Sequence, residues 1–130
     1  LLAELVGIAI DNCPELEAAW NNPDRQRLLP VLQYVQDNMS QPLCRTDLAR
    51  VAGMSVPHLH ALFVRAFGAA PMAMVMRERM QHARQLLHWS DLPIAEVGQQ
   101  CGFADPYYFS RAFKREEGVP PSRYRQTVRR

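Results

Sequence analysis

The chain has 130 residues, of which 48% are hydrophobic, 22% charged and 8% aromatic, and its 15 basic and 13 acidic side chains give a formal net charge of +2. This length fits one ordinary domain or two very small ones, and the apolar fraction is too high for a disordered tail. No apolar run approaches the roughly 20 residues that span a bilayer, and the first ten residues lack the flanks of a secretory signal. We therefore expect a cytoplasmic protein with no membrane partner. Because the chain starts at leucine, we also expect it to be a fragment of a longer protein.

The expected elements are almost all helical and are separated by prolines and glycines. Residues 1–10 place apolar side chains along one helical face, and residues 11–26 resemble a linker with about one helical turn. The apolar spacing from Leu28 to Met39 predicts a helix that starts near Arg27, because Pro30 is tolerated only in a first turn. Further helices are predicted over residues 46–52, 56–67, 71–89, 93–101 and 106–117.

An internal repeat is the most informative feature of the sequence. Residues 48–53 match residues 97–102 at an offset of 49, and residues 55–71 match residues 105–121 at an offset of 50. Each copy has a short helix, a glycine that permits a sharp reversal, a Ser or Asp N-cap, and a longer helix that ends at glycine. This is the helix-turn-helix arrangement, and two copies in one chain favour DNA binding.

Each longer helix has one apolar face and one mixed face. The apolar residues, which we expect in the core, are Leu59, Leu62, Phe63 and Ala66 in the first copy and Phe109, Ala112 and Phe113 in the second. The opposite face carries Pro57, His60, Ala61, Val64 and Arg65 in the first copy and Pro106, Tyr107, Ser110, Arg111 and Lys114 in the second. The second helix is therefore better equipped for contact with bases and phosphates than the first.

The small net charge hides an uneven distribution along the chain. Residues 1–40 hold two basic and six acidic side chains, a net charge of −4, whereas residues 41–130 hold 13 and seven, a net charge of +6. Fourteen of the 15 basic residues are arginine, whose planar donors match phosphates and guanine edges better than lysine does. This pattern hints at nucleic acid, although a solvated surface of mixed charge is a commoner cause of it.

Catalytic and metal-binding patterns are missing from the sequence. The odd number of cysteines favours a reducing compartment, and we expect Cys44 and Cys101 to pack as small apolar groups, because neither has a histidine placed for nucleophilic catalysis. His58 and His60 lie two residues apart on an expected helix, so they cannot chelate a metal from one face. The sequence thus predicts neither an enzyme, nor a metal site, nor a cofactor.

Several segments closely resemble the AraC/XylS family of transcription regulators. The signature is carried by GFADPYYFSRAFKREEGVPPSRYR at residues 102–125, which follows PIAEVGQQC at residues 93–101. The first motif and linker helix of that family resemble DLARVAGMS at residues 47–55, HLHALFVRAFG at residues 58–68 and RMQHARQLL at residues 79–87. The match covers roughly residues 28–126. It implies an all-α, homeodomain-like fold of two helix-turn-helix subdomains joined by a long linker helix, with the two recognition helices in successive major grooves of double-stranded DNA.

The resemblance also assigns roles to residues of the two recognition helices. Base contacts are expected at Pro57, His60 and Ala61 in the first helix and at Pro106, Tyr107 and Arg111 in the second. Ala61 departs from many relatives, which have a polar or basic side chain there, and it can offer only a methyl contact.

Phosphate contacts are expected mainly from charged and hydroxyl side chains later in these helices. Arg65 is expected on phosphate in the first helix, while Ser110, Lys114 and Arg115 position the DNA backbone in the second. For Arg111 a structural alternative remains, an ion pair with Glu96 or Asp105.

The resulting organisation has four parts. Residues 1–26 are an N-terminal helix and linker from a missing effector or dimerisation domain, residues 27–70 the first helix-turn-helix subdomain, residues 71–89 the linker helix, and residues 90–130 the second subdomain. The expected function is sequence-specific DNA binding by an activator that recruits RNA polymerase, with a homodimer formed through residues 1–10 or the missing domain. The alternative is a helical protein-interaction or dimerisation module that binds no DNA.

Overall fold

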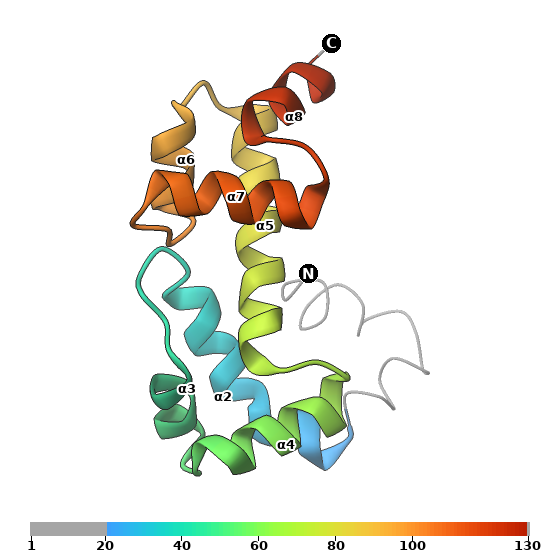
Figure 1. Cartoon of the computed structure of the whole chain (residues 1–130). Coiled ribbons are helices and arrows are strands. Elements are labelled where there is room, and N and C mark those ends of the chain that lie inside the picture. Colours follow the sequence, from blue (N-terminus) through green and yellow to red (C-terminus); the bar gives the residue numbers. More distant parts are fainter. Residues whose placement is uncertain (1–20, 130) are drawn as a thin grey trace. The chain divides into compact units, whose positions relative to one another are not determined.

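The computed structural model describes residues 21–129, and every regular element in that range is an α-helix (Figure 1). The helices are α2 (Pro23–Asp37), α3 (Arg45–Ala52), α4 (Val56–Phe67), α5 (Pro71–Trp89), α6 (Ile94–Gln100), α7 (Pro106–Glu117) and α8 (Pro121–Val128). No strand occurs between residues 21 and 129, which confirms the predicted all-α class. The helix predicted over residues 1–10 lies outside the described residues.

The described chain divides into two compact units. The first unit contains residues 21–38 and 43–76, and the second contains residues 39–42 and 77–129, so that the sequence of α5 is divided between them after Met76. Each unit holds one helix-turn-helix pair, α3 with α4 in the first and α6 with α7 in the second. The predicted duplicated fold with a long helix between the two pairs is therefore confirmed.

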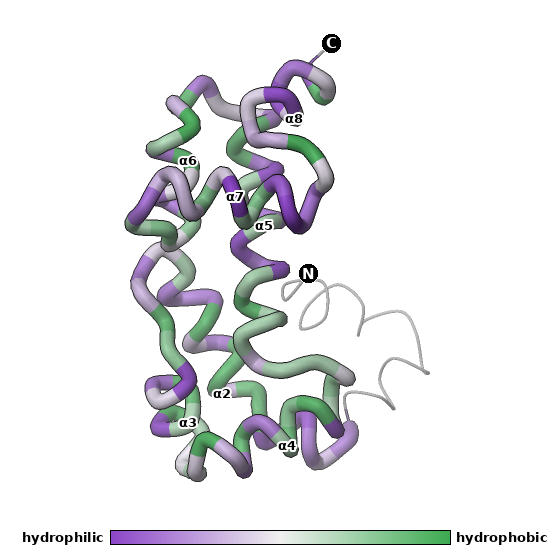
Figure 2. The backbone as a smooth tube through the Cα atoms, viewed as in Figure 1, coloured by the Kyte–Doolittle hydropathy of each residue, from purple (hydrophilic) through white to green (hydrophobic). Residues whose placement is uncertain are grey.

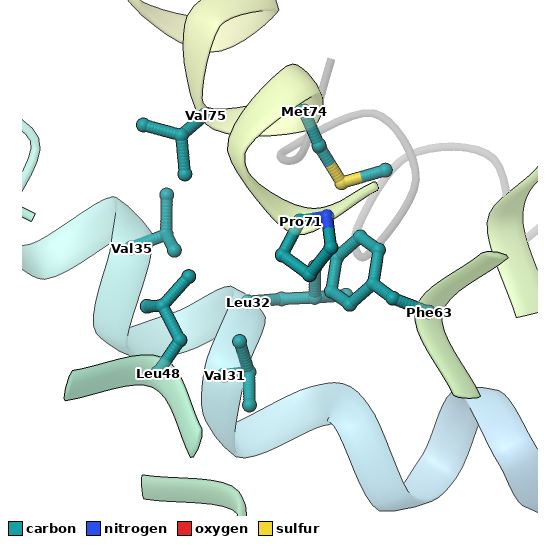
Figure 3. A pocket seen from close by; sticks show the side chains of 8 residues that line it. All are labelled: Val31, Leu32, Val35, Leu48, Phe63, Pro71, Met74 and Val75. Atoms are coloured by element: carbon teal, nitrogen blue, oxygen red, sulfur yellow. The ribbon is translucent and has the colours of Figure 1, made fainter. Parts of the chain in front are cut away.

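The core of the first unit forms where α2 lies against its helix-turn-helix pair. Figure 3 shows side chains of α2 directed toward Leu48 of α3, Phe63 of α4 and the first turn of α5. The eight side chains at this point are Val31, Leu32, Val35, Leu48, Phe63, Pro71, Met74 and Val75. The space between them is too small for a water molecule, so this packing is dry. Each fully buried aliphatic or aromatic side chain of this kind contributes about 1.5–3 kcal/mol.

The core of the second unit is mostly aromatic. The ring centroids of Phe103 and Phe109 lie 5.3 Å apart, and those of Phe109 and Phe113 lie 6.0 Å apart, both in tilted arrangements that aromatic pairs favour. Cys101 is fully buried in the same unit, and burial raises the pKa of its thiol to about 12, so the thiol remains protonated at neutral pH. Its predicted role as a small apolar group is confirmed.

The same prediction is wrong for Cys44, which is exposed. Cys44 precedes the first residue of α3 rather than facing a core. Its Sγ donates a hydrogen bond to Asp47 Oδ2 at 2.9 Å and lies 3.0 Å from the hydroxyl of Thr46. The thiol therefore sits among polar partners at the start of the helix, and those partners replace the apolar packing that we expected.

The predicted start of α2 near Arg27 is also wrong. The helix begins at Pro23, where Asn22 is the N-cap and its side chain accepts a hydrogen bond from the Asp24 amide at 2.8 Å. Pro30 then lies inside the helix, where it lacks the N–H that would bond to the carbonyl of Gln26. Both residues are exposed, so water can satisfy that carbonyl.

Residues 39–42 are fastened to the second unit by a buried arginine. Arg79 of α5 is 8% exposed, and its Nη2 donates a hydrogen bond to the carbonyl of Gln41 at 3.0 Å. Its guanidinium lies over the ring of Phe103 at 5.7 Å from the centroid, and burial lowers its pKa. This side chain therefore links Gln41, in the connection between α2 and α3, to Phe103, in the turn between α6 and α7.

Candidate nucleic-acid interface

The N-terminus of α4 is set by a tight turn and a side-chain cap. Gly53 ends α3 with a φ of 70°, a left-handed conformation that glycine adopts without strain. Two residues later, Ser55 Oγ accepts a hydrogen bond from the His58 amide at 3.2 Å, and Pro57 occupies the first turn of α4. The first recognition helix thus begins where the repeat predicted.

The second recognition helix begins in an equivalent way. Gly102 in the turn has a φ of 92°, and Asp105 Oδ1 accepts a hydrogen bond from the Tyr107 amide at 2.9 Å. Pro106 is the first residue of α7. Capping leaves the remaining N–H groups of the first turn pointing outward, as they do in helices that contact DNA phosphates.

The inward faces of α4 and α7 are fixed by the cores of their units. The predicted core residues are all buried, which confirms that expectation: Leu59, Leu62, Phe63 and Ala66 in α4 and Phe109, Ala112 and Phe113 in α7. Because these residues recur at helical spacing, the opposite face of each helix must point to solvent.

The outward face of α4 is weakly charged. The structure exposes the four residues that were predicted as its DNA contacts, Pro57, His60, Ala61 and Arg65. Arg65 is bound to Asp24 at the start of α2, with Nε to Oδ2 at 2.8 Å and Nη2 to Oδ1 at 3.1 Å. These hydrogen bonds lower the pKa of the Asp24 carboxyl and raise that of Arg65. Figure 2 shows that hydrophobic residues are common along α4 and sparser along α7.

The outward face of α7 is more basic and carries an aromatic side chain. Of the six predicted contacts on this helix, Pro106, Tyr107, Arg111, Lys114 and Arg115 are exposed, and Ser110 is partly exposed. The side chain of Tyr107 is 76% exposed, although tyrosine usually loses much of its surface to packing. An exposed phenol beside several cations is a reasonable surface for bases and phosphates.

The charged residues of α7 differ in whether they have partners. Within the described residues, no ion pair or hydrogen bond joins Arg111 to Glu96 or Asp105, so the structural alternative for this arginine is not found. The ion pair of Arg115 within residues 21–129 is with the neighbouring Glu116, with 3.6 Å between Nε and Oε1. Such an exposed contact contributes little and can be exchanged for a phosphate at small cost.

One feature beside α4 was not predicted from the sequence. A hollow of about 280 Å³ lies at the N-terminus of the helix, and its wall includes Arg45 together with the predicted contacts Pro57 and His60. Arg45 is the first residue of α3 and is exposed. The sequence signal was a basic residue at the start of the first helix of the pair, but only the fold brings it beside His60.

Clusters of metal ligands and single membrane-spanning helices are both missing from residues 21–129. No group of three or more His, Cys, Asp or Glu side chains is placed to hold a metal ion in that range. No single helix there is long and apolar enough to cross a membrane. The pair α4 and α5 reaches that length and hydropathy only jointly, across a bend, as the buried helices of a protein core can also do.

A duplicated helix-turn-helix with exposed, partly basic recognition helices defines the class of helix-turn-helix DNA-binding domains. The helix-turn-helix domain family matches residues 48–127, which is more than half of the chain. The chain belongs to this family in its AraC/XylS form. Because this family is a DNA-binding domain of transcription regulators, the expectation that this chain is not an enzyme domain is confirmed.

Relatives and solved structures agree with this assignment. The HTH-type transcriptional regulator GlxA of Rhizobium meliloti is 39% identical over 76% of this chain and 31% of its own length, and the HTH-type transcriptional activator RhaS of Klebsiella pneumoniae is 33% identical over 85% and 39%. The DNA-binding domain of AdpA, solved in complex with a target DNA, has a TM-score of 0.75 and 29% identity, with 79% of this chain and 93% of that chain covered. An AraC-type regulator from Chromobacterium violaceum has a TM-score of 0.73 and 27% identity, with 83% and 96% covered. The chain spans less than half the length of these two curated relatives.

Proposed function

We propose that this chain is the sequence-specific, double-stranded DNA-binding domain of a transcription regulator, in which α4 and α7 enter the major groove. The observation that carries the proposal is the outward face of α7, where Arg111 is exposed and has no ion pair within residues 21–129. An arginine held on a rigid helix, with its guanidinium free, can form the bidentate contact with guanine that is the commonest specific contact in the major groove.

The proposed contacts have different roles. In α7, Arg111 contacts a base or an adjacent phosphate, Tyr107 and Pro106 lie against base edges, and Ser110, Lys114 and Arg115 position the DNA backbone. In α4, Pro57 and Ala61 offer only apolar contact, of the kind that a thymine methyl accepts, and His60 is the main polar candidate. Arg65 differs from the rest because Asp24 already binds its guanidinium.

The two recognition helices are proposed to use successive turns of one DNA face. Helix α5 has 19 residues, which at 1.5 Å per residue is about 28 Å, comparable with the roughly 34 Å of one DNA turn. Two half-sites about 10–10.5 base pairs apart, centre to centre, would then match the two units.

The regulator as a whole is proposed to act as an activator in the cytoplasm, where it recruits RNA polymerase and forms a homodimer. Support for activation comes from a relative that is itself named a transcriptional activator. The proposed dimer contacts lie in residues 1–10 or in the part of such relatives that this chain does not span.

A mobility-shift titration across salt concentrations tests the proposed function. A DNA-binding domain should shift a duplex pool at low salt, and the slope of log affinity against log salt should be about −0.9 for each phosphate neutralised. The competing function, a helical protein-interaction module, predicts no binding to any duplex. A complete absence of binding at 50 mM salt would therefore contradict the proposal.

A further inference from the structure

The start of α2 and the end of α4 are joined by two neighbouring residues. Asp24 accepts two hydrogen bonds from Arg65, and both of its carboxylate oxygens are used. The next residue, Arg25, donates from Nε to the carbonyl of Ala66 at 2.9 Å, and its guanidinium lies 5.3 Å from the ring centroid of Phe67. The end of the first recognition helix is therefore clamped to α2 at the position of its only arginine.

Asp24 is well placed to keep its charge. It lies in the first turn of α2, where the helix dipole favours a carboxylate, and its side chain is only 26% exposed. Arg65 is 62% exposed, so DNA could reach it. A phosphate that approaches Arg65 would have to displace or share a carboxylate that already satisfies two of its donors.

The second copy of the repeat lacks such a clamp. The counterpart of Arg65 is Arg115, whose ion pair within residues 21–129 is with the adjacent Glu116 at 3.6 Å. The positions that hold Ala61 and Val64 in α4 hold Arg111 and Lys114 in α7. With Arg65 paired to Asp24, the outward face of α4 carries no other Lys, Arg, Asp or Glu, whereas that of α7 keeps its cations.

We propose that Asp24 is a specificity-determining residue that withholds Arg65 from DNA phosphate, so that α4 adds little sequence-independent affinity. This proposal rests on the proposed DNA-binding function. Binding that depends on phosphates alone favours every sequence equally, so a neutralised Arg65 reduces competition from non-specific DNA. The Asp24 carboxylate thus competes with DNA phosphate for the guanidinium of Arg65.

The central experiment measures binding of a random-sequence duplex between 50 and 200 mM salt by fluorescence anisotropy. Asp24→Asn keeps the shape of the side chain but removes its charge. We expect it to bind more tightly than the wild type and to steepen the salt slope by about 0.9, which corresponds to about threefold more affinity lost across this range. In Asp24→Asn/Arg65→Ala the slope should return to that of the wild type.

Asp37→Asn is the matched control for the change in net charge. Asp37 lies in the same helix and is exposed, but its carboxylate accepts a hydrogen bond from the neutral Gln33 instead of an arginine. This variant changes the charge of the chain equally and releases no cation, so its salt slope should equal that of the wild type.

Arg65→Ala alone gives a second test that does not require the Asp24 variant to fold. If Asp24 withholds Arg65, this variant keeps the slope of the wild type. A slope reduced by about 0.9 would show that Arg65 already contacts a phosphate, and the proposal would be wrong. It would also be wrong if Asp24→Asn bound no better than Asp37→Asn, or more weakly, since Asp24 would then only orient Arg65. Failure of the wild type to bind any duplex would instead refute the underlying DNA-binding function.

Discussion

Equivalent residues of the two recognition helices have diverged in chemistry. At an offset of 50, Ala61 corresponds to Arg111 and Val64 to Lys114, while the buried Leu59 and Phe109 both remain apolar. Packing constrains the inward residues because a lost or added methylene is felt throughout a dense core. The outward residues have no such constraint, so they can be adapted to DNA without loss of the fold.

Arg111→Ala should weaken binding at a specific site by about 1–3 kcal/mol and relax the preference at one base pair, because it removes a base contact made from a rigid helix. The measurement is competition between the selected site and its single-base variants. Arg123→Ala is the matched control, since Arg123 is an exposed arginine of α8 outside the proposed interface. Equal sequence preference in Arg111→Ala and the wild type would show that Arg111 does not contact a base.

At the scale of elements, packing of α6 against α7 explains a difference between the two copies of the repeat. A Cβ added to Gly98 of α6 would lie 2.7 Å from two ring carbons of Phe109, closer than carbon atoms can approach. The first copy has Ala49 and Leu59 at the corresponding positions. A larger residue on one helix is thus matched by a smaller one on the other, which keeps the short helix close to the long one.

Gly98→Ala should therefore destabilise the domain, at a steric cost of about 1–3 kcal/mol, less the roughly 1 kcal/mol that alanine gains over glycine inside a helix. Because these effects oppose each other, the decisive measurement is a double-mutant cycle in urea with Phe109→Leu. The double variant should be more stable than the two single changes predict, as it restores the pair found in the first copy. Additive changes in the free energy of unfolding would contradict the steric explanation.

Sequence rules for caps and prolines predicted most helices, but they failed where tertiary contacts determine the bounds of a helix. The bounds of α4, α5 and α7 follow from caps and prolines, and they agree with the sequence prediction. At Pro30 the local rule gave the wrong start for α2, because burial of Leu28 and Val31 outweighs one lost hydrogen bond on an exposed side.

Helix α8 was not predicted because contacts distant in sequence hold it. Its Arg125 donates from Nε to the carbonyl of Leu87 at 3.1 Å and from Nη2 to that of Ser90 at 3.2 Å. These acceptors lie at and just beyond the end of α5, where helix carbonyls have no partner within the helix. An eight-residue helix is marginal alone, so its stability depends on such partners.

At the scale of the whole molecule, the repeat made the duplicated fold and both recognition faces predictable from sequence. Which charged side chains on those faces form ion pairs was not predictable. Asp24 and Arg65 are 41 residues apart, and no periodicity connects them. The net charge of +6 over residues 41–130 consequently overstates the cations available to DNA. Asp24, which lies outside that range, holds Arg65, and backbone carbonyls bind Arg79 and Arg125. Specificity must then depend on a few placed side chains more than on the overall field.

The two half-sites should therefore be defined unequally. Selection from a random duplex library should give a strong sequence preference in the half contacted by α7 and a weak one in the half contacted by α4, since Ala61 has no hydrogen-bonding group.

Ala61→Arg should sharpen the weak half at one or two base pairs, with about 1–3 kcal/mol of discrimination at each. Val64→Lys adds the same charge three residues later on the exposed face, where it should raise affinity for all sequences alike. If both variants changed the selected sequences equally, or if the wild type selected two equally defined halves, the side chain at position 61 would not limit readout by α4.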